Sequence, residues 1–265
     1  MTDSILYKII ICILAGAGAG IGTGFAGLSA AAFISPMLVA FLDVPIYEAV
    51  AIALASDVLA SAVSAYTYAR EKRVDMKRGK FLLIAVIVFT IVGSAVAYFV
   101  SSTTVGDTAL GYWSIIGSLL LGINFLIKGR KNKESRGLPK KVNPIAATIL
   151  CGAIVGFICG FQGAGGGLMM LFVLTSVLAY EMKTAVGTSV FIMTFTALLG
   201  ALIHFFVKGT VPDWLMLGTC ILSTLICARV ASVIANRISS AEQKIATGIL
   251  LTVSGLAMLV VKIFF

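Results

Sequence analysis

The sequence predicts an all-α polytopic membrane protein, with about ten transmembrane helices in two inverted five-helix repeats that carry glycine-rich helix breaks. Three observations predict this fold class. The 265 residues are 60% hydrophobic and only 12% charged, whereas a soluble domain has about 25% charged residues. Apolar runs close to the ~20 residues that cross a bilayer recur along the whole chain. A pattern of glycines in the first run also returns 136 residues later.

The repeat is visible without a gap in "ILAGAGAGIGTGFAG" (13–27) and "ILCGAIVGFICGFQG" (149–163). Eight of these fifteen paired positions are identical. Glycines spaced by four residues lie on one face of a helix, and such a face lets membrane helices approach closely. We therefore expect an internal duplication, with the first repeat over 1–127, a basic linker over 128–143 and the second repeat over 144–265.

Each predicted half contains five apolar segments. Those of the first half are 5–24, 28–42, 46–69, 80–100 and 108–127. Those of the second half are 144–160, 165–179, 184–207, 212–235 and 243–264. The second segment of each half has about 15 residues and reaches only ~22 Å as a helix, less than the ~30 Å hydrocarbon core. We expect these two segments to be half-helices or to cross beside irregular backbone.

The positive charges predict the orientation in the membrane. With ten crossings, 17 of the 20 basic residues fall on one side, in the loops 70–80 and 128–141 and at Lys183, Arg229, Arg237 and Lys244. Loops rich in lysine and arginine stay in the cytoplasm. The prediction is a multi-pass protein of the plasma or inner membrane, with both basic loops cytoplasmic and both termini outside.

The glycine-rich stretches "GFAGLSAA" (24–31) and "GFQGAGGG" (160–167) interrupt matching positions of the two halves. Broken helices in corresponding positions indicate the binding site of a transporter, because free backbone groups at membrane depth must face protein or a watery cavity. A helix that restarts after such a break also presents N–H groups to an anion. The predicted substrate-binding residues are Gly24, Gly27, Ser29, Gln162, Gly163, Gly165, Gly166, Gly167, Thr188 and Ser189.

Alternatives remain for these residues. The glycines can serve helix packing alone, and the hydroxyls of Thr188 and Ser189 can bond to carbonyls of their own helix.

Three ionisable residues are further candidates. Asp57 lies in the middle of an apolar segment, where a carboxylate is costly and indicates function. We expect it to carry a coupling proton, with cation binding or a structural hydrogen bond as alternatives. His204, the only histidine, is a second coupling candidate or an interfacial residue. Arg229 is a candidate anion contact, or a side chain that snorkels to the interface.

Several classes of function are disfavoured. No nucleophile and base occur at an evident spacing, so an enzyme is not expected. The chain lacks the His, Cys, Asp and Glu cluster that transition metals prefer, and we predict neither a metal nor a cofactor. The net charge of +9 follows from topology rather than from nucleic-acid binding. The expected partners are a small anion, the lipid bilayer, a coupling ion (H⁺ or Na⁺) and, through the glycine stripes, a second copy of the chain.

Two long stretches resemble a known family. "GFQGAGGGLMMLFVL" with "KTAVGTSVFIMTFTALLGALIHFFVKGTVPDW" (183–214) resembles the second-half signature of the TauE/SafE family of membrane transporters. "ICARVASVIANRISSAEQKIATGILLTVSGLAML" (226–259) resembles its closing helices, and the family often has an arginine where Arg229 stands in "ARVA". The first half departs from the family's usual G-x-G-G-G run, since "GFAGLSAAAFISP" carries Ser29 and alanines there, although Pro36 fits.

The resemblance implies transport of sulfite, sulfonates or related organosulfur anions, usually viewed as export. Together with the paired breaks, it predicts a secondary transporter of a small, sulfur-containing anion. This anion is expected to bind near the midplane between the two breaks, and an ion or proton gradient is expected to drive its movement. The alternatives are a passive anion channel and a cation or metal transporter that uses Asp57.

Overall fold

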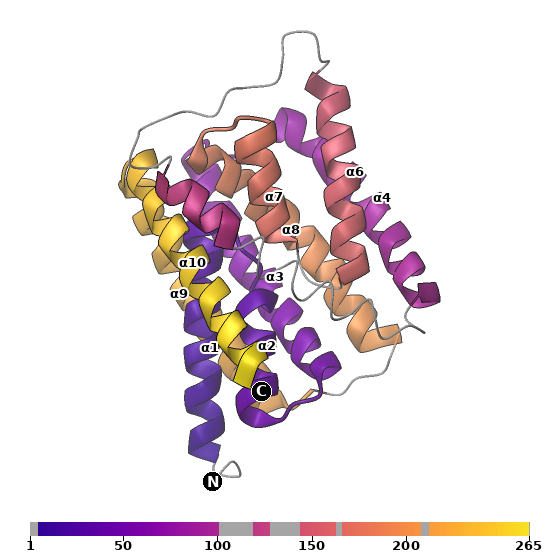
Figure 1. The fold of residues 1–265 in the computed structure, drawn as a ribbon, viewed down its shortest axis with the longest axis vertical. Coiled ribbons are helices and arrows are strands. Elements are labelled where there is room, and N and C mark those ends of the chain that lie inside the picture. Colours follow the sequence, from indigo (N-terminus) through magenta and orange to yellow (C-terminus); the bar gives the residue numbers. More distant parts are fainter. Residues whose placement is uncertain (1–4, 101–118, 128–143, 163–165, 208–211, 265) are drawn as a thin grey trace.

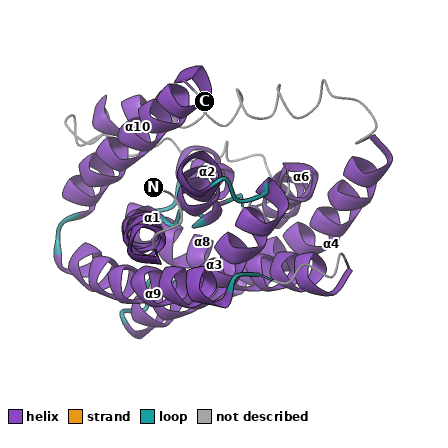
Figure 2. Ribbon diagram, turned by 90° about the horizontal axis from the view of Figure 1, so that it is seen from below, coloured by secondary structure: helices purple, strands orange, loops and turns teal. Residues whose placement is uncertain are grey.

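The structure is a computed structural model that describes residues 5–100, 119–127, 144–162, 166–207 and 212–264 (Figure 1). Throughout these ranges the chain forms helices with short connections and no strand (Figure 2). The helices of the first part are α1 (Ile5–Ala26), α2 (Ala31–Leu42), α3 (Ile46–Arg70), α4 (Met76–Val100) and a helical stretch over 119–127. Those of the second part are α6 (Pro144–Gln162), α7 (Gly167–Phe172), α8 (Met182–Leu202), α9 (Trp214–Arg237) and α10 (Ser240–Phe264).

The all-α prediction is confirmed, and each of the ten predicted segments contains a described helix. Two π-helical turns, η1 (Val173–Val177) and η2 (Ile203–Val207), continue α7 and α8. Within the described ranges, four helices are long and apolar enough to cross a membrane, namely Ile5–Ala26, Ile46–Arg70, Met182–Phe205 and Trp214–Arg237. The chain is therefore a multi-pass membrane protein.

The second helix of each half is short, as predicted. The 12 residues of α2 reach about 18 Å, and the 11 residues of α7 with η1 reach about 16 Å, against the ~30 Å of the hydrocarbon core. Neither spans a bilayer alone. The helix starts of the two halves also keep the sequence offset, since Ala31 and Gly167, and likewise Ile46 and Met182, stand 136 residues apart.

The glycine stripes form close helix contacts between the two halves. Helix α1 packs along α9 and helix α6 packs along α4, so each pair joins a helix of one half to a helix of the other. A Cβ on Gly20 of α1 would lie 2.4 Å from the carbonyl oxygen of Thr224 in α9. A Cβ on Gly156 of α6 would lie 2.4 Å from the carbonyl oxygen of Val86 in α4. These glycines serve close helix packing.

Helices α3 and α8 form the centre of the bundle. They pack on each other and lie between α1 on one side and α4 and α6 on the other (Figure 2). In the view of Figure 1, α1 begins at the bottom of the molecule and α6 begins at the top. The corresponding first helices of the two halves thus start from opposite ends of the bundle.

The close approach of α1 and α9 leads to a stability prediction. Gly20→Ala forces a methyl group onto the backbone of α9, and overpacking of this kind costs about 1–3 kcal/mol. We expect a clearly lower melting temperature in detergent, followed by intrinsic fluorescence. Gly18→Ala is the matched control in the same helix, because its Cβ would lie 3.7 Å from a ring carbon of Phe33, an ordinary contact. Equal melting temperatures for the two variants would contradict the packing.

Candidate functional site

The first break separates α1 from α2. Helix α1 ends at Ala26, and Gly27 follows with a φ of +62°, a left-handed conformation that glycine adopts at no steric cost. The N–H of Gly27 donates to the carbonyl oxygen of Thr23 at 2.9 Å, a common way for a helix to end. The chain then resumes helical structure at Ala31.

The carbonyl groups that α1 releases at this break are bonded by side chains from three other helices. Such groups must find partners at membrane depth, where each free one costs several kcal/mol. Tyr68 of α3 donates to Gly24 O at 2.9 Å, Gln243 of α10 donates to Phe25 O at 2.9 Å, and Ser189 of α8 donates to Gly27 O at 3.2 Å. Side chains of the surrounding helices thus stabilise the break.

The second break meets the first one directly. Gly166, with a φ of +53°, precedes α7, while Gly163, Gly165 and the side chain of Gln162 lie outside the described part of the chain. A Cβ on Gly167 would lie 2.6 Å from Gly27 O and 2.7 Å from Ser29 N. The two breaks therefore touch backbone to backbone, and only glycine fits at this contact.

A buried carboxyl group lies beside this junction. The hydroxyl of Ser29 donates to Oδ2 of Asp57 at 2.6 Å, and Asp57 is 0% exposed. Its other oxygen, Oδ1, has no hydrogen-bond partner among the residues that the structure describes. The predicted residues Ser29, Asp57, Gly167 and Ser189 are thus brought together at one place, although they come from four helical segments or their connections.

Other predicted residues lie elsewhere. Gly24 packs against α9, since its Cβ would lie 2.6 Å from Ala228 O. The hydroxyl of Thr188 accepts from the backbone N–H of Asp75 at 3.1 Å, although the neighbouring Ser189 faces the break. The ring of His204 lies 4.3 Å from that of Tyr47.

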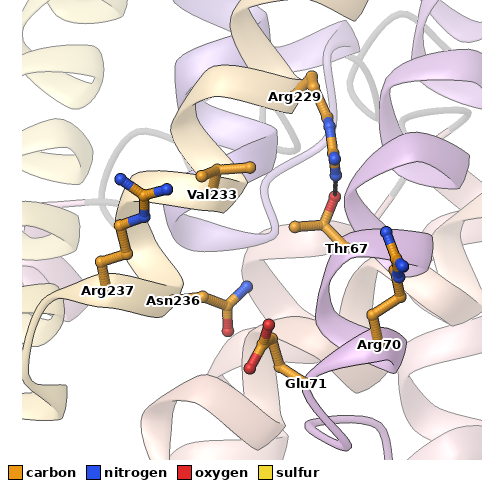
Figure 3. Close-up of a pocket in the computed structure, with 7 residues that line it drawn as sticks. All are labelled: Thr67, Arg70, Glu71, Arg229, Val233, Asn236 and Arg237. Atoms are coloured by element: carbon orange, nitrogen blue, oxygen red, sulfur yellow. Dashed lines mark hydrogen bonds between the residues drawn. The ribbon is translucent and has the colours of Figure 1, made fainter.

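Two of the ionisable candidates are therefore remote from Asp57. His204 follows Met193, a residue near Gly167, by eleven positions, or about 16 Å along a helix. Arg229 of α9 donates to the hydroxyl of Thr67 in a pocket between the ends of α3 and α9 (Figure 3). Neither belongs to the junction of the breaks.

A buried polar stripe runs along α3 from Asp57. Ser61, Ser64 and Tyr68 follow it at spacings of four, three and four residues, which places all four side chains on one helix face. Each of them is 0% exposed. Sequence reasoning missed Ser64 and Tyr68, although the helical spacing from Asp57 indicates them. It also missed Gln243, for which no local pattern gives a signal.

Contacts between the halves hold the bundle at the end where α3 finishes and α4 begins, here called the α3–α4 end. Arg73 and Glu181 form an ion pair at 2.9 Å, and the hydroxyl of Tyr180 donates to Asp75 at 2.8 Å. Burial, together with the hydrogen bond to Asp75, raises the pKa of Tyr180 well above its ordinary value, so this hydroxyl remains a donor.

At the opposite end, the backbone N–H of Asp213 donates to Glu48 at 3.1 Å. Lys8 also lies 4.0 Å from Asp213. In this structure both ends of the bundle are therefore joined by polar contacts between the halves.

Comparison with known proteins decides the family. A family model described as "Sulfite exporter TauE/SafE" matches residues 12–258. The chain belongs to the TauE/SafE family. The match covers both breaks and Asp57, and it confirms the resemblance on which the transport prediction was based.

Three curated relatives are named as probable membrane transporters. "Probable membrane transporter protein YunE" of Bacillus subtilis (strain 168) is 24% identical over 229 residues, which cover 80% of this chain and 81% of the relative. "Probable membrane transporter protein YdhB" of the same organism is 23% identical over 240 residues, which cover 91% and 96%. A Methanocaldococcus jannaschii protein with the same type of name is 28% identical over 212 residues, which cover 78% and 72%. This TauE/SafE chain is accordingly a membrane transporter and not an enzyme.

Proposed function

We propose that this TauE/SafE transporter is a secondary carrier of a small sulfur-containing anion, bound near the bilayer midplane where its two helix breaks meet. One observation carries the proposal. The backbone at Gly27 and Ser29 touches Gly167 without an intervening side chain, next to the buried carboxyl group of Asp57.

The junction suits an anion for a physical reason. The helical stretch over 167–177 starts there, so its first backbone N–H groups and positive dipole end point toward the first break. The hydroxyls of Ser29 and Ser189 lie at the same place and can turn from their present acceptors to an oxyanion. Such donors act strongly in a site from which water is excluded.

Asp57 is proposed to couple anion movement to protons. Two negative charges a few ångströms apart repel strongly at the low effective dielectric of a protein interior. An anion at the junction therefore favours the neutral, protonated form of Asp57, and protonation in turn favours the anion. The free Oδ1 atom of Asp57 offers the place for this proton. Met193, one repeat length further on, has no titratable group, so only one half supplies a carrier.

We further propose that the halves 1–127 and 144–265 are inverted repeats that rock against each other. The opposite starting points of α1 and α6 (Figure 1) and the reciprocal pairs α1–α9 and α6–α4 support this proposal. Alternating access then consists of releasing the polar contacts at one end while those at the other hold. Among the described residues, most of the basic side chains lie at the α3–α4 end, which is assigned to the cytoplasm.

Ligand binding to the purified protein tests the substrate class. A ligand that binds only the folded state raises stability, by about 2.7 kcal/mol at a hundred times its Kd. We expect sulfite, thiosulfate or a short sulfonate to raise the melting temperature, with carboxylates of equal size as controls. Stabilisation by divalent metals alone, lost in Asp57→Asn, would instead support the cation alternative and overturn the anion proposal.

Flux into vesicles tests the transport mode. A carrier moves one substrate per conformational cycle, and such motions take microseconds to seconds. We expect uptake that saturates with substrate and responds to an imposed proton or sodium gradient. Ohmic single-channel currents would show a passive channel.

A further inference from the structure

A pocket of about 240 Å³ lies at the α3–α4 end, between the last turns of α3 and α9. Three arginines line it together with one carboxylate and one carboxamide (Figure 3). These residues are Arg70, Arg229, Arg237, Glu71 and Asn236. Lysine and arginine side chains are common at the membrane interface, but here three arginines line one cavity.

The arginine side chains of this pocket are positioned by neighbouring residues and still have N–H groups available for a ligand. Arg229 is half-buried and donates one N–H to Thr67, which leaves several of its five N–H groups for a ligand. Arg70 is stacked over the ring of Tyr66 at 5.6 Å. Within the described residues, none of the three arginines forms an ion pair within 4.0 Å.

Hydrogen-bond acceptors lie together on another side of the same pocket. Nδ2 of Asn236 donates to Ser232 O at 3.0 Å, which turns Oδ1 the other way. This Oδ1 atom is buried and has no partner among the described residues. In Figure 3 the carboxamide of Asn236 and the carboxylate of Glu71 face each other. A carboxylate beside an unsatisfied amide oxygen is a site for an ammonium group.

We propose that this pocket binds a small zwitterion, with an oxyanion group on the arginines and an ammonium group between Glu71 and Asn236. Two sources share this chemistry: a free amino-sulfonate, or the phosphoethanolamine headgroup of a lipid. The first source rests on the proposed function, whereas the pocket itself does not. Thr67 stands ten residues after Asp57 on α3, about 15 Å along the helix, so the pocket is separate from the junction of the breaks.

The test compares two ligands that differ only in the amino group. Full-length protein in detergent, without added lipid, is titrated calorimetrically with 2-aminoethanesulfonate and with ethanesulfonate. Arg229→Gln is expected to weaken binding of both ligands at least tenfold. Glu71→Gln is expected to weaken binding of the zwitterion and to strengthen binding of ethanesulfonate. Lys80→Gln, an exposed charge change outside the pocket, should leave both affinities within twofold.

A second experiment with lipids tests whether the ligand of the pocket is a lipid headgroup rather than a free zwitterion. The protein is placed in nanodiscs of phosphatidylethanolamine or of phosphatidylglycerol. Stabilisation by phosphatidylethanolamine alone, lost in both Arg229→Gln and Glu71→Gln, supports the pocket with a lipid as its ligand. If neither the free zwitterion nor this lipid depends on Arg229 and Glu71, the inference is overturned. Stronger binding of both free ligands in Glu71→Gln would also overturn it, because the pocket would then bind anions only.

Failure of this inference is distinguishable from failure of the proposed function. Gly167→Ala alters the central junction and leaves the pocket intact. Zwitterion binding that is lost in Gly167→Ala but kept in Arg229→Gln places the ligand at the junction and overturns the inference. Binding that is lost in the pocket variants supports the inference even when vesicles show no flux of any anion.

Discussion

Asp57→Asn is expected to abolish proton-driven anion uptake while anion binding is kept, at an affinity equal to or higher than the native one, because asparagine is neutral like protonated Asp57. Asparagine keeps the size of the side chain and an oxygen that accepts from Ser29, which now bonds Asp57 at 2.6 Å. It cannot gain or lose a proton in the physiological range. The measurement is flux into vesicles under an imposed pH gradient, with calorimetric binding in detergent alongside.

Asp43→Asn is the matched control for this change. Asp43 is exposed at the end of α2 with a φ of 51°, a left-handed conformation that asparagine tolerates well. Both its flux and its pH response should equal those of the native chain. Gradient-driven uptake at the native rate in Asp57→Asn would remove Asp57 from the coupling step. Parallel loss of binding and flux would assign it to the substrate site instead.

Gly167→Ala is expected to lower flux by about two orders of magnitude, since a misplacement near 1 Å at a reacting or binding centre has that effect. The added Cβ would lie 2.6 Å from Gly27 O and 2.7 Å from Ser29 N. Both atoms belong to the backbone, so the two breaks must move apart. The melting temperature should fall as well, because overpacking costs about 1–3 kcal/mol.

Gly218→Ala provides the control for this second prediction. Gly218 lies within α9, and no atom stands within 4 Å of its Cβ position. Alanine is the better helix former by about 1 kcal/mol, so this variant should be as stable as the native chain or slightly more stable. Native flux in Gly167→Ala would contradict the contact between the breaks.

Local sequence signals were sufficient to predict the helices. A helix in a bilayer needs an apolar run of a set length, and glycine interrupts it, so run length and glycine position together indicate where α1 and α7 begin or end. The length of the apolar runs 28–42 and 165–179 predicted that α2 and α7 are both short. These features depend on residues that are close together in the chain.

The site depended on contacts that no local pattern encodes. Ser29 and Asp57 are 28 residues apart, and Gln243 reaches Phe25 across 218 residues. Thr188 and Ser189 are neighbours with equivalent chemistry, yet one bonds the start of α4 and the other bonds the first break. Their side chains differ by about 100° in direction around α8, and only the packing of α3 and α4 decides what each one meets.

The pairing of α1 with α9 has a consequence for how the protein is made. Helix α1 ends at residue 26 and α9 begins at residue 214, so about 190 residues must be synthesised in between, which takes ~10–40 s at 5–20 residues per second. During that interval the glycine stripe of α1 is in the bilayer without its partner. Helix α4 is also made before its partner α6, but only residues 101–143 lie between them. A nascent chain of this protein therefore cannot complete its first half before its second half arrives, and insertion and assembly are separate stages in time.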